Sequence, residues 1–289
     1  MIINNNWLVD NLLNNKGFMA LRQGNVEATA ILQSIEDARK NPSPKGDTFG
    51  KGAQKEGIYS QIYTNAGFYG DEACYRKWKN EYIRALMNMD CHLDVVSCVS
   101  FVICGDLLTK LNIFSPTLGY IERIDFWVNL LEIFKKYKKK ICVVSYFANE
   151  MATQYKNIKN IFPHVDLSDI NIKFVESWNT IKGNELHKDW NDTFNKLKKK
   201  IDNTDSDIYL VSCGCYGLPL CNYIKSKNKN SIYVGGLLQM VFGLKGNRWY
   251  KRLNMNKYYN KHWKYPTKKP KNAMGVENWC YGNSLSEPP

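Results

Sequence analysis

Short hydrophobic runs alternate with longer amphipathic segments along most of the chain. The short runs have the length and composition of buried strands, and the longer segments have the three- and four-residue apolar spacing of helices. Strands are predicted at 18–21, 95–104, 141–147, 172–175, 208–213 and 232–234. Helices are predicted at 26–39, 73–89, 124–137, 150–160, 186–201 and 218–225.

This alternation predicts an α/β fold with a largely parallel, Rossmann-like sheet flanked by helices. We expect a single domain over residues 1–282 and a disordered tail at 283–289. Segment 41–57 is rich in Pro, Gly and Lys and predicts a flexible surface loop, either a plain connector or a lid over an anionic ligand. Ligands bind such sheets beyond the carboxyl ends of the strands, so functional residues are expected in the turns there.

Composition excludes several classes of protein. Hydrophobic residues make up 44% of the chain, enough for a buried core, which excludes a disordered linker. The mean hydropathy is −0.44, and no apolar run approaches the roughly 20 residues that span a bilayer. The first ten residues lack the features of a signal peptide, and the nine cysteines include no C-x-x-C pair. We therefore expect a cytoplasmic protein with reduced thiols, in the host cytoplasm if the gene is viral.

The formal net charge of +13 comes mainly from lysine, since only seven of the 40 basic residues are Arg. The lysine runs at 135–140 and 198–200 lie at the ends of predicted helices. There they complement the helix dipole and remain solvated. This pattern favours a solvated surface over a specific nucleic-acid interface, which would cluster Arg and Lys with aromatic residues.

The turn after the strand at 208–213 is the strongest local signal for a binding site. It contains Gly214, Tyr216 and Gly217, and Pro219 follows at the start of a predicted helix. Glycines at such a junction allow close backbone approach, and free N–H groups at a helix start suit a phosphate. The turn is therefore a candidate phosphate site, and the alternative is a tight structural turn.

A second strand-turn-helix unit follows directly, with Gly235 and Gly236 in its turn and Gln239 and Arg248 beyond it. Either these polar side chains hold a base, ribose or phosphate, or Gln239 caps backbone groups and Arg248 pairs with an acid.

The first predicted strand ends in a turn that carries Arg22, Gly24 and Glu27. Both charged side chains can reach the mouth of the sheet. Arg22 is suited to phosphate, and Glu27 to a metal ion, a ribose hydroxyl or Arg22 itself.

Taken together, several short motifs resemble the GT-D-like glycosyltransferase family over about residues 18–281, with 207–249 the most specific part. The motifs are R-x-G-x-x-E at 22–27, N-A-G-F at 65–68, K-I-C-V-V-S-Y-F at 140–147 with Gln154-Tyr155, G-x-Y-G-x-P-L at 214–220, V-G-G-x-x-Q at 234–239, F-G-x-K-G-x-R-W at 242–249, N-x-x-W-x-x-P at 260–266 and V-E-x-x-C-Y at 276–281.

The resemblance implies an enzyme of glycan biosynthesis that moves a hexose or pentose from a nucleoside-diphosphate sugar to a hydroxyl of an oligosaccharide or glycoprotein. A UDP-sugar is favoured, with UDP-xylose the first expectation. The implied donor-binding residues are Arg22, Gly24 and Glu27 near the diphosphate, Asn65 and Gly67 on the donor side, Gly214, Tyr216 and Gly217 in the phosphate turn, and Gly235, Gly236, Gln239, Arg248 and Trp249 in the second turn.

Two departures from the family pattern bear on mechanism. The family holds a divalent metal with Asp-x-Glu, whereas this chain has Asn25 before Glu27, so either Glu27 binds Mn²⁺ or Mg²⁺ or the reaction is metal-independent. Ser145 and Tyr146 stand where the family has His-Pro.

Inverting transfer needs a base near the acceptor hydroxyl. The candidates are Glu122, Glu277 and Asp71, each of which is otherwise a surface or ion-pair carboxylate.

Two other functions fit parts of the sequence. One is nucleic-acid binding, in which lysines contact phosphates and the aromatic residues at 249–263 stack on bases. The other is a different nucleotide-sugar-modifying enzyme, such as a methyltransferase or dehydrogenase, although no G-x-G-x-x-G opens the first strand-helix unit.

Overall fold

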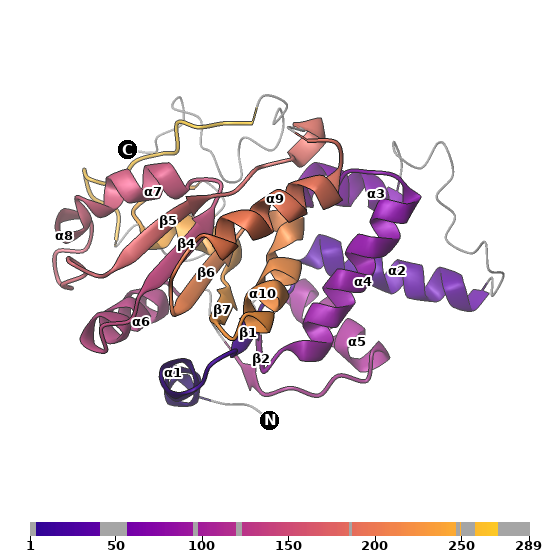
Figure 1. Ribbon diagram of the computed structural model, residues 1–289, viewed down its shortest axis with the longest axis horizontal. Coiled ribbons are helices and arrows are strands. Elements are labelled where there is room, and N and C mark those ends of the chain that lie inside the picture. The colour runs from indigo at the N-terminus through magenta and orange to yellow at the C-terminus, as the bar shows by residue number, and fades with distance from the viewer. Residues whose placement is uncertain are drawn as a thin grey trace.

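The computed structural model describes residues 4–40, 57–94, 98–119, 123–184, 187–246, 249 and 258–270. At its centre lies a seven-stranded sheet in the order β3-β2-β1-β7-β6-β4-β5, and every strand pairing is parallel (Figure 1). The strands are β1 (Met19–Leu21), β2 (Cys91–Leu93), β3 (Thr117–Leu118), β4 (Ile141–Ser145), β5 (Ile172–Glu176), β6 (Ile208–Ser212) and β7 (Asn230–Tyr233). The predicted α/β, Rossmann-like fold is confirmed.

Helices cover both faces of the sheet and enclose two hydrophobic cores. The first face carries α2 (Asn25–Lys40), α3 (Gly57–Gln61), the π-helical turn η1 (Ile62–Ala66), α4 (Glu72–Asn88), α5 (Cys98–Lys110), α9 (Trp190–Asp202) and α10 (Gly217–Ser226). The second face carries α1 (Asn5–Asn14), α6 (Ile124–Lys136), α7 (Ala148–Tyr155), α8 (Ile158–Ile161) and α11 (Leu238–Val241). Short 3₁₀ turns complete the described elements: η2 (Ile181–Gly183), η3 (Gly214–Tyr216) and η4 (Gly235–Leu237).

Strands β4 and β6 are apolar up to their last residue because both of their faces are buried. In β4, Ile141 and Val143 point into one core, while Cys142 and Val144 point into the other. This accounts for the continuous hydrophobic runs in the sequence.

The prediction of a strand at 95–104 is wrong for the residues described, because 98–104 lie in helix α5. A short apolar run fits a buried helix as well as a buried strand. Here α5 packs against α2 and buries Cys104 and Leu107, so its apolar residues serve a helix-helix contact. The strand of this region is β2, which precedes the run.

Two predicted helices have different limits in the structure. The predicted helix at 150–160 is divided into α7 and α8. The one at 186–201 begins as α9 at Trp190, where the Asp189 carboxylate accepts a hydrogen bond from the Asp192 N–H at 2.9 Å. Of the predicted loop 41–57, only Gly57 lies within the described residues, and it begins α3.

Neighbouring strands β1 and β7 send the chain to opposite faces of the sheet. After β1 the chain enters α2 on the first face, and after β7 it enters η4 and α11 on the second face. Such a switch point is where open parallel sheets bind ligands. The neighbours β6 and β4 diverge in the same way, into α10 and α7.

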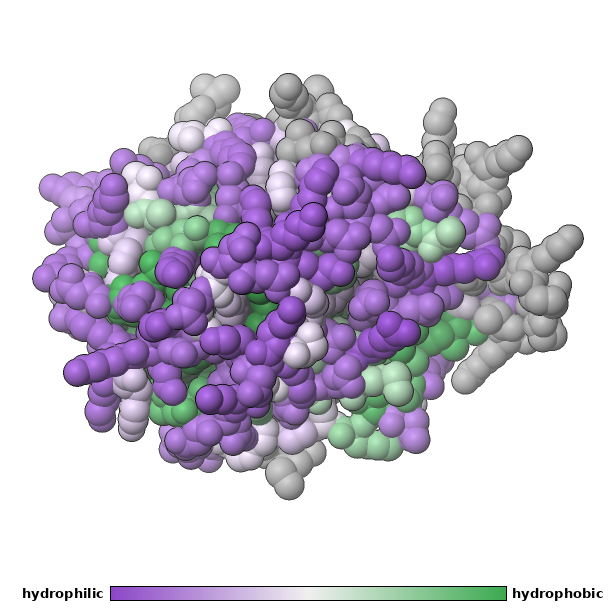
Figure 2. All heavy atoms as spheres, viewed as in Figure 1, coloured by the Kyte–Doolittle hydropathy of each residue, from purple (hydrophilic) through white to green (hydrophobic). Residues whose placement is uncertain are grey.

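Among the described residues, no helix has both the length and the apolar character needed to cross a membrane. Hydrophilic residues predominate on the face shown in Figure 2.

Candidate functional site

Arg22 is a buried cation at the switch point between β1 and β7. It follows β1 directly, and only 9% of its surface is exposed. Its Nε atom is buried without a hydrogen-bond partner, and within the described ranges no carboxylate forms an ion pair with its guanidinium. A buried charge without a partner is costly to the folded state. Arg22 is therefore well suited to bind an anion.

The turn after β7 lies against Arg22. Gly235 has a φ of +70°, and a Cβ atom on it would lie 2.5 Å from Arg22 Nη1. A Cβ on Gly236 would lie 3.3 Å from the ring of Trp249. The structure thus brings together Arg22 and the glycine pair that the sequence placed about 210 residues later. Glycine is needed at position 235 for its backbone conformation and for the space that Arg22 takes.

Gln23 adds a buried amide beside Arg22. The side chain is fully buried, and its Nε2 donates to the Cys104 carbonyl at 3.3 Å and lies 3.4 Å from His92 Nε2. Burial lowers the pKa of His92 to about 4, so the imidazole is neutral at pH 7 and can accept from the amide. The Gln23 Oε1 atom has no hydrogen-bond partner.

Two further unpaired oxygens lie near the start of α2. They are Asn25 Oδ1 and the hydroxyl of Tyr82. Burial raises the pKa of Tyr82, and the nearby Glu27 carboxylate raises it further. Nearly all buried polar atoms in folded proteins are paired, so a concentration of unpaired ones calls for an explanation. A ligand bound at this end of β1 would supply partners for them.

Glu27 points towards the start of its own helix. It lies in the first turn of α2 and is 8% exposed, and a Cβ on Gly24 would collide with its carboxylate. A carboxylate there is stabilised by the helix dipole. Within the described residues, no group of three or more His, Cys, Asp or Glu side chains could hold a metal ion.

The predicted phosphate turn after β6 is closely packed against protein. Gly214 has a φ of +53°, and a Cβ on it would lie 2.5 Å from the Ala66 carbonyl oxygen. A Cβ on Gly217 would collide with the ring of Tyr233. These contacts explain both glycines without a ligand, as expected for a structural turn. A phosphate bound at this turn stays a prediction.

Tyr216, in the same turn, is a core residue. Its ring stacks on Trp190 at a centroid distance of 5.7 Å, and its hydroxyl lies 3.0 Å from Thr180 Oγ1. Thr180 also donates to the carbonyl of Gly67, which has a φ of +80°. The predicted donor-side pair therefore lies next to the turn after β6, with Gly67 packed against Thr180 and Asn65 exposed.

Gln239 stabilises the backbone beyond α11. Its Nε2 donates to the Lys245 carbonyl at 2.9 Å, as the alternative interpretation of this residue expects.

Of the predicted bases, Asp71 lies in the described part of the chain, and Glu122 and Glu277 lie outside it. The predicted donor-binding residue Arg248 also lies outside it. Asp71 caps α4, because its carboxylate accepts from the Cys74 N–H at 2.8 Å.

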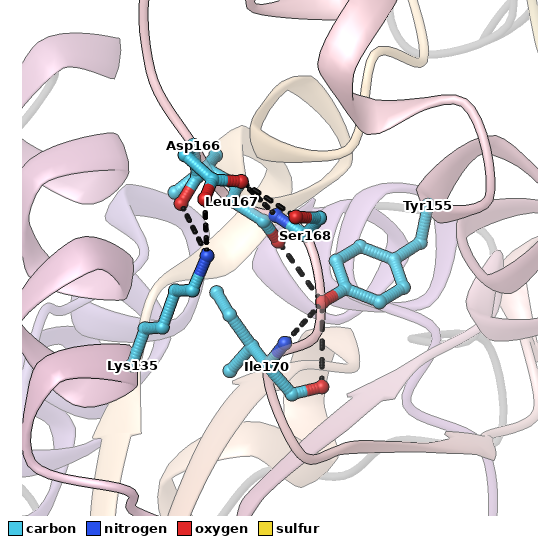
Figure 3. Close-up of polar contacts among 6 residues, drawn as sticks. All are labelled: Lys135, Tyr155, Asp166, Leu167, Ser168 and Ile170. Atoms are coloured by element: carbon cyan, nitrogen blue, oxygen red, sulfur yellow. Dashed lines mark hydrogen bonds and ion pairs between the residues drawn. The ribbon is translucent and has the colours of Figure 1, made fainter.

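Gln154 and Tyr155, which belong to one of the family-like motifs, have structural roles. The Gln154 amide donates to the carbonyls of Gly243 and His262, each at 3.0 Å. The Tyr155 hydroxyl donates to the Leu167 carbonyl and accepts from the Ile170 N–H, and so fixes the loop before β5 (Figure 3).

Sequence reasoning missed Gln23, His92 and Tyr82. A polar residue directly after a buried strand was a usable signal for Gln23. His92 had no such signal, because β2 is only three residues long and was not predicted.

Comparisons with protein-family models, with curated proteins and with solved structures find no match to this chain.

Proposed function

We propose that the protein is a glycosyltransferase that binds the diphosphate of a nucleotide sugar at the β1–β7 switch point. The observation that carries the proposal is the state of Arg22 at that switch point. Arg22 is buried and has no ion-pair partner among the described residues, and it lies against the turn at Gly235. The motif resemblance adds the reaction class, the transfer of a sugar to a glycan hydroxyl. A UDP-sugar is the proposed donor, with UDP-xylose first.

Arg22 suits this chemistry because negative charge develops on the diphosphate as it leaves the sugar. A guanidinium remains protonated and can donate two parallel hydrogen bonds to phosphate oxygens. Its charge is already oriented and partly removed from water, and both conditions strengthen electrostatic stabilisation of a transition state.

The unpaired oxygens of Gln23 and Asn25 fit the same donor. Both are hydrogen-bond acceptors within three residues of Arg22. A nucleotide sugar carries hydroxyl donors close to its phosphates. Both oxygens are buried, so they can accept from such hydroxyl groups only after the turn rearranges on binding.

For the base we propose Glu122 or Glu277. Asp71 is the weaker choice, because its carboxylate is already occupied in capping α4.

Ligand binding tests the proposal directly. We expect UDP and UDP-sugars to raise the melting temperature, and Arg22→Gln to abolish the shift. Arg76→Gln is the matched control, because Arg76 is an exposed arginine paired with Glu72 within α4. Incubation with a panel of UDP- and GDP-sugars then identifies the donor by hydrolysis or transfer. A protein that shows no nucleotide-dependent shift, hydrolysis or transfer with any donor would rule out this function.

A further inference from the structure

The charges at the end of β1 are arranged for an anion and against a divalent cation. Arg22 supplies a positive charge, and position 25 carries an amide in place of a carboxylate. His92 is neutral, because burial lowers its pKa to about 4. Glu27 is the acidic residue of this turn, and it points towards Gly24 at the start of α2.

The Glu27 carboxylate lies close enough to three core side chains to affect their pKa values. After burial, it is the next cause that raises the pKa of Tyr82, Tyr233 and Cys215. All three belong to the core on the first face of the sheet. The Glu27 carboxylate thus lies within electrostatic reach of the core on the first face of the sheet.

These residues do not fit the divalent metal that the family resemblance implies. Mg²⁺ at nucleotide sites is held by one or two carboxylates together with substrate phosphates. In this turn the first position of the family's Asp-x-Glu is the amide Asn25, and the Glu27 carboxylate lies against Gly24. A dication beside Arg22 would also be repelled by the guanidinium, and that repulsion is strong in a partly buried site. The amide of Asn25 cannot offset it.

We propose that Arg22 takes the place of a metal ion, and that this protein binds the diphosphate of its donor without a divalent cation. The inference rests on the proposed function and deepens it. Asn25 is three residues after Arg22 and adds no negative charge to the turn, so the charge of Arg22 stays available to phosphate.

Asn25→Asp separates this inference from a general binding defect. The new carboxylate would compete with phosphate for Arg22, so we expect UDP affinity in EDTA to fall by about tenfold or more. Addition of Mn²⁺ should restore part of it. Asn25→Ala is the matched control, because it removes the same unpaired oxygen without adding charge. UDP affinity in EDTA should be about tenfold or more lower in Asn25→Asp than in Asn25→Ala.

The experiment is calorimetric titration of the full chain with UDP and with inorganic pyrophosphate, in excess EDTA and in Mn²⁺. For each ligand, we expect the dissociation constants of the wild type in EDTA and in Mn²⁺ to agree within about threefold. Binding that requires Mn²⁺ would overturn this inference and leave the proposed function intact. An absence of binding under both conditions would remove the anion site itself and, with it, the proposed function. Unchanged metal-free affinity in Asn25→Asp would overturn the role of Asn25.

Discussion

Gly235 controls the position of Arg22. Its φ of +70° is unfavourable for any residue with a side chain, and its missing Cβ leaves room for the guanidinium. We expect Gly235→Ala to cost about 1–3 kcal/mol of unfolding free energy through backbone strain. We also expect it to weaken UDP binding by about tenfold or more, because Arg22 must move.

Gly105→Ala is the control for this substitution. Gly105 lies in α5 with open space where a Cβ would go, so alanine there should stabilise the protein by about 0.5–1 kcal/mol. Urea denaturation and calorimetric titration of the two variants measure both effects. Normal UDP affinity in Gly235→Ala would show that the turn does not position Arg22.

His92 should make stability depend on pH below neutrality. Its pKa is about 4 in the folded state, against an ordinary value of 6.5, because burial disfavours the imidazolium. As pH falls below 6.5 the unfolded chain gains a proton that the folded protein rejects. The free energy of unfolding should therefore fall between pH 6.5 and 4, by about 3 kcal/mol in total from this group.

Urea denaturation at several pH values, compared between wild type and His92→Gln, isolates this contribution from those of the carboxylates. The variant should show a flatter profile between pH 6.5 and 4. Parallel profiles would mean that His92 gains its proton at the same pH in the folded and unfolded states.

At the scale of elements, residues 258–270 cross the carboxyl ends of β4 and β5 and are attached in two ways (Figure 1, yellow). The first part is held by packing: Trp263 is buried and contacts Phe162 at a ring distance of 5.5 Å. The second part is a clasp at Thr267 and Lys268, and it is polar.

In the clasp, the Glu150 carboxylate accepts from the N–H groups of Thr267 and Lys268, at 3.1 and 2.7 Å. The Lys268 ammonium pairs with Glu176 and lies 4.2 Å from the centroid of the Tyr146 ring. With 38% and 30% of the Lys268 and Glu176 side chains exposed, this ion pair is accessible to solvent and sensitive to salt.

The clasp should therefore open more readily than the rest of the segment. An exposed ion pair contributes about 0.2–1 kcal/mol, so its loss should favour opening of the clasp by up to about fivefold. Lys268→Gln should therefore speed hydrogen exchange of the backbone amides at positions 267 and 268 by the same factor. High salt should have a similar effect on the wild type. Lys269→Gln, which removes an adjacent exposed charge, should change neither amide.

Exchange of individual amides followed by NMR makes this test. The Lys264 amide, which donates to the Gly243 carbonyl in the packed part, is the internal reference. Equal acceleration at Lys264 would show that the whole segment detaches and that no separate clasp exists.

The sequence was informative for elements whose periodicity extends over several residues. Strands β4, β5 and β6 and helices α2, α4 and α6 follow the predicted ranges closely. The three residues of β2 and the two of β3 are too few to show a strand period, and the apolar run at 95–104 fits either structure. Strand order is also absent from the local pattern, because the pairing of β1 with β7 joins residues more than 200 positions apart.

The candidate site shows the same division. Arg22 and Gly235 were identifiable from their turns, but their contact depends on the β1–β7 pairing. The packing of Gly214 against Ala66 and of Gly217 against Tyr233 was not predictable, because each contact joins distant parts of the chain.

At the scale of the molecule, many lysines have local acidic partners. Within the described residues, ion pairs join Lys135 to Asp166, Lys140 and Lys229 to Asp205, Lys225 to Asp90, and Lys227 to Asp202. Asp90, Lys140 and Lys229 directly precede strands β2, β4 and β7, at their amino ends. Arg22 directly follows β1, at its carboxyl end. These paired lysines thus lie at the opposite end of the strands from the candidate anion site.

This separation distinguishes nucleotide binding from nucleic-acid binding. Binding of a polyanion to surface lysines releases counterions, so its affinity should fall by orders of magnitude between about 50 and 200 mM salt. UDP bound at Arg22 should lose less than about threefold over the same range, because partly buried charges are screened much less. Fluorescence anisotropy of a labelled oligonucleotide and calorimetry with UDP, each at several salt concentrations, measure the two slopes.

The competition between the two ligands completes the test. An oligonucleotide bound to the lysines at the amino ends of the strands should not be displaced by UDP. In that case Arg22→Gln should abolish UDP binding and leave the oligonucleotide unaffected. If instead UDP affinity falls as steeply with salt as oligonucleotide affinity, or if Arg22→Gln weakens both ligands, the two share one surface. The basic residues that give the chain its net charge of +13 would then contribute directly to ligand binding.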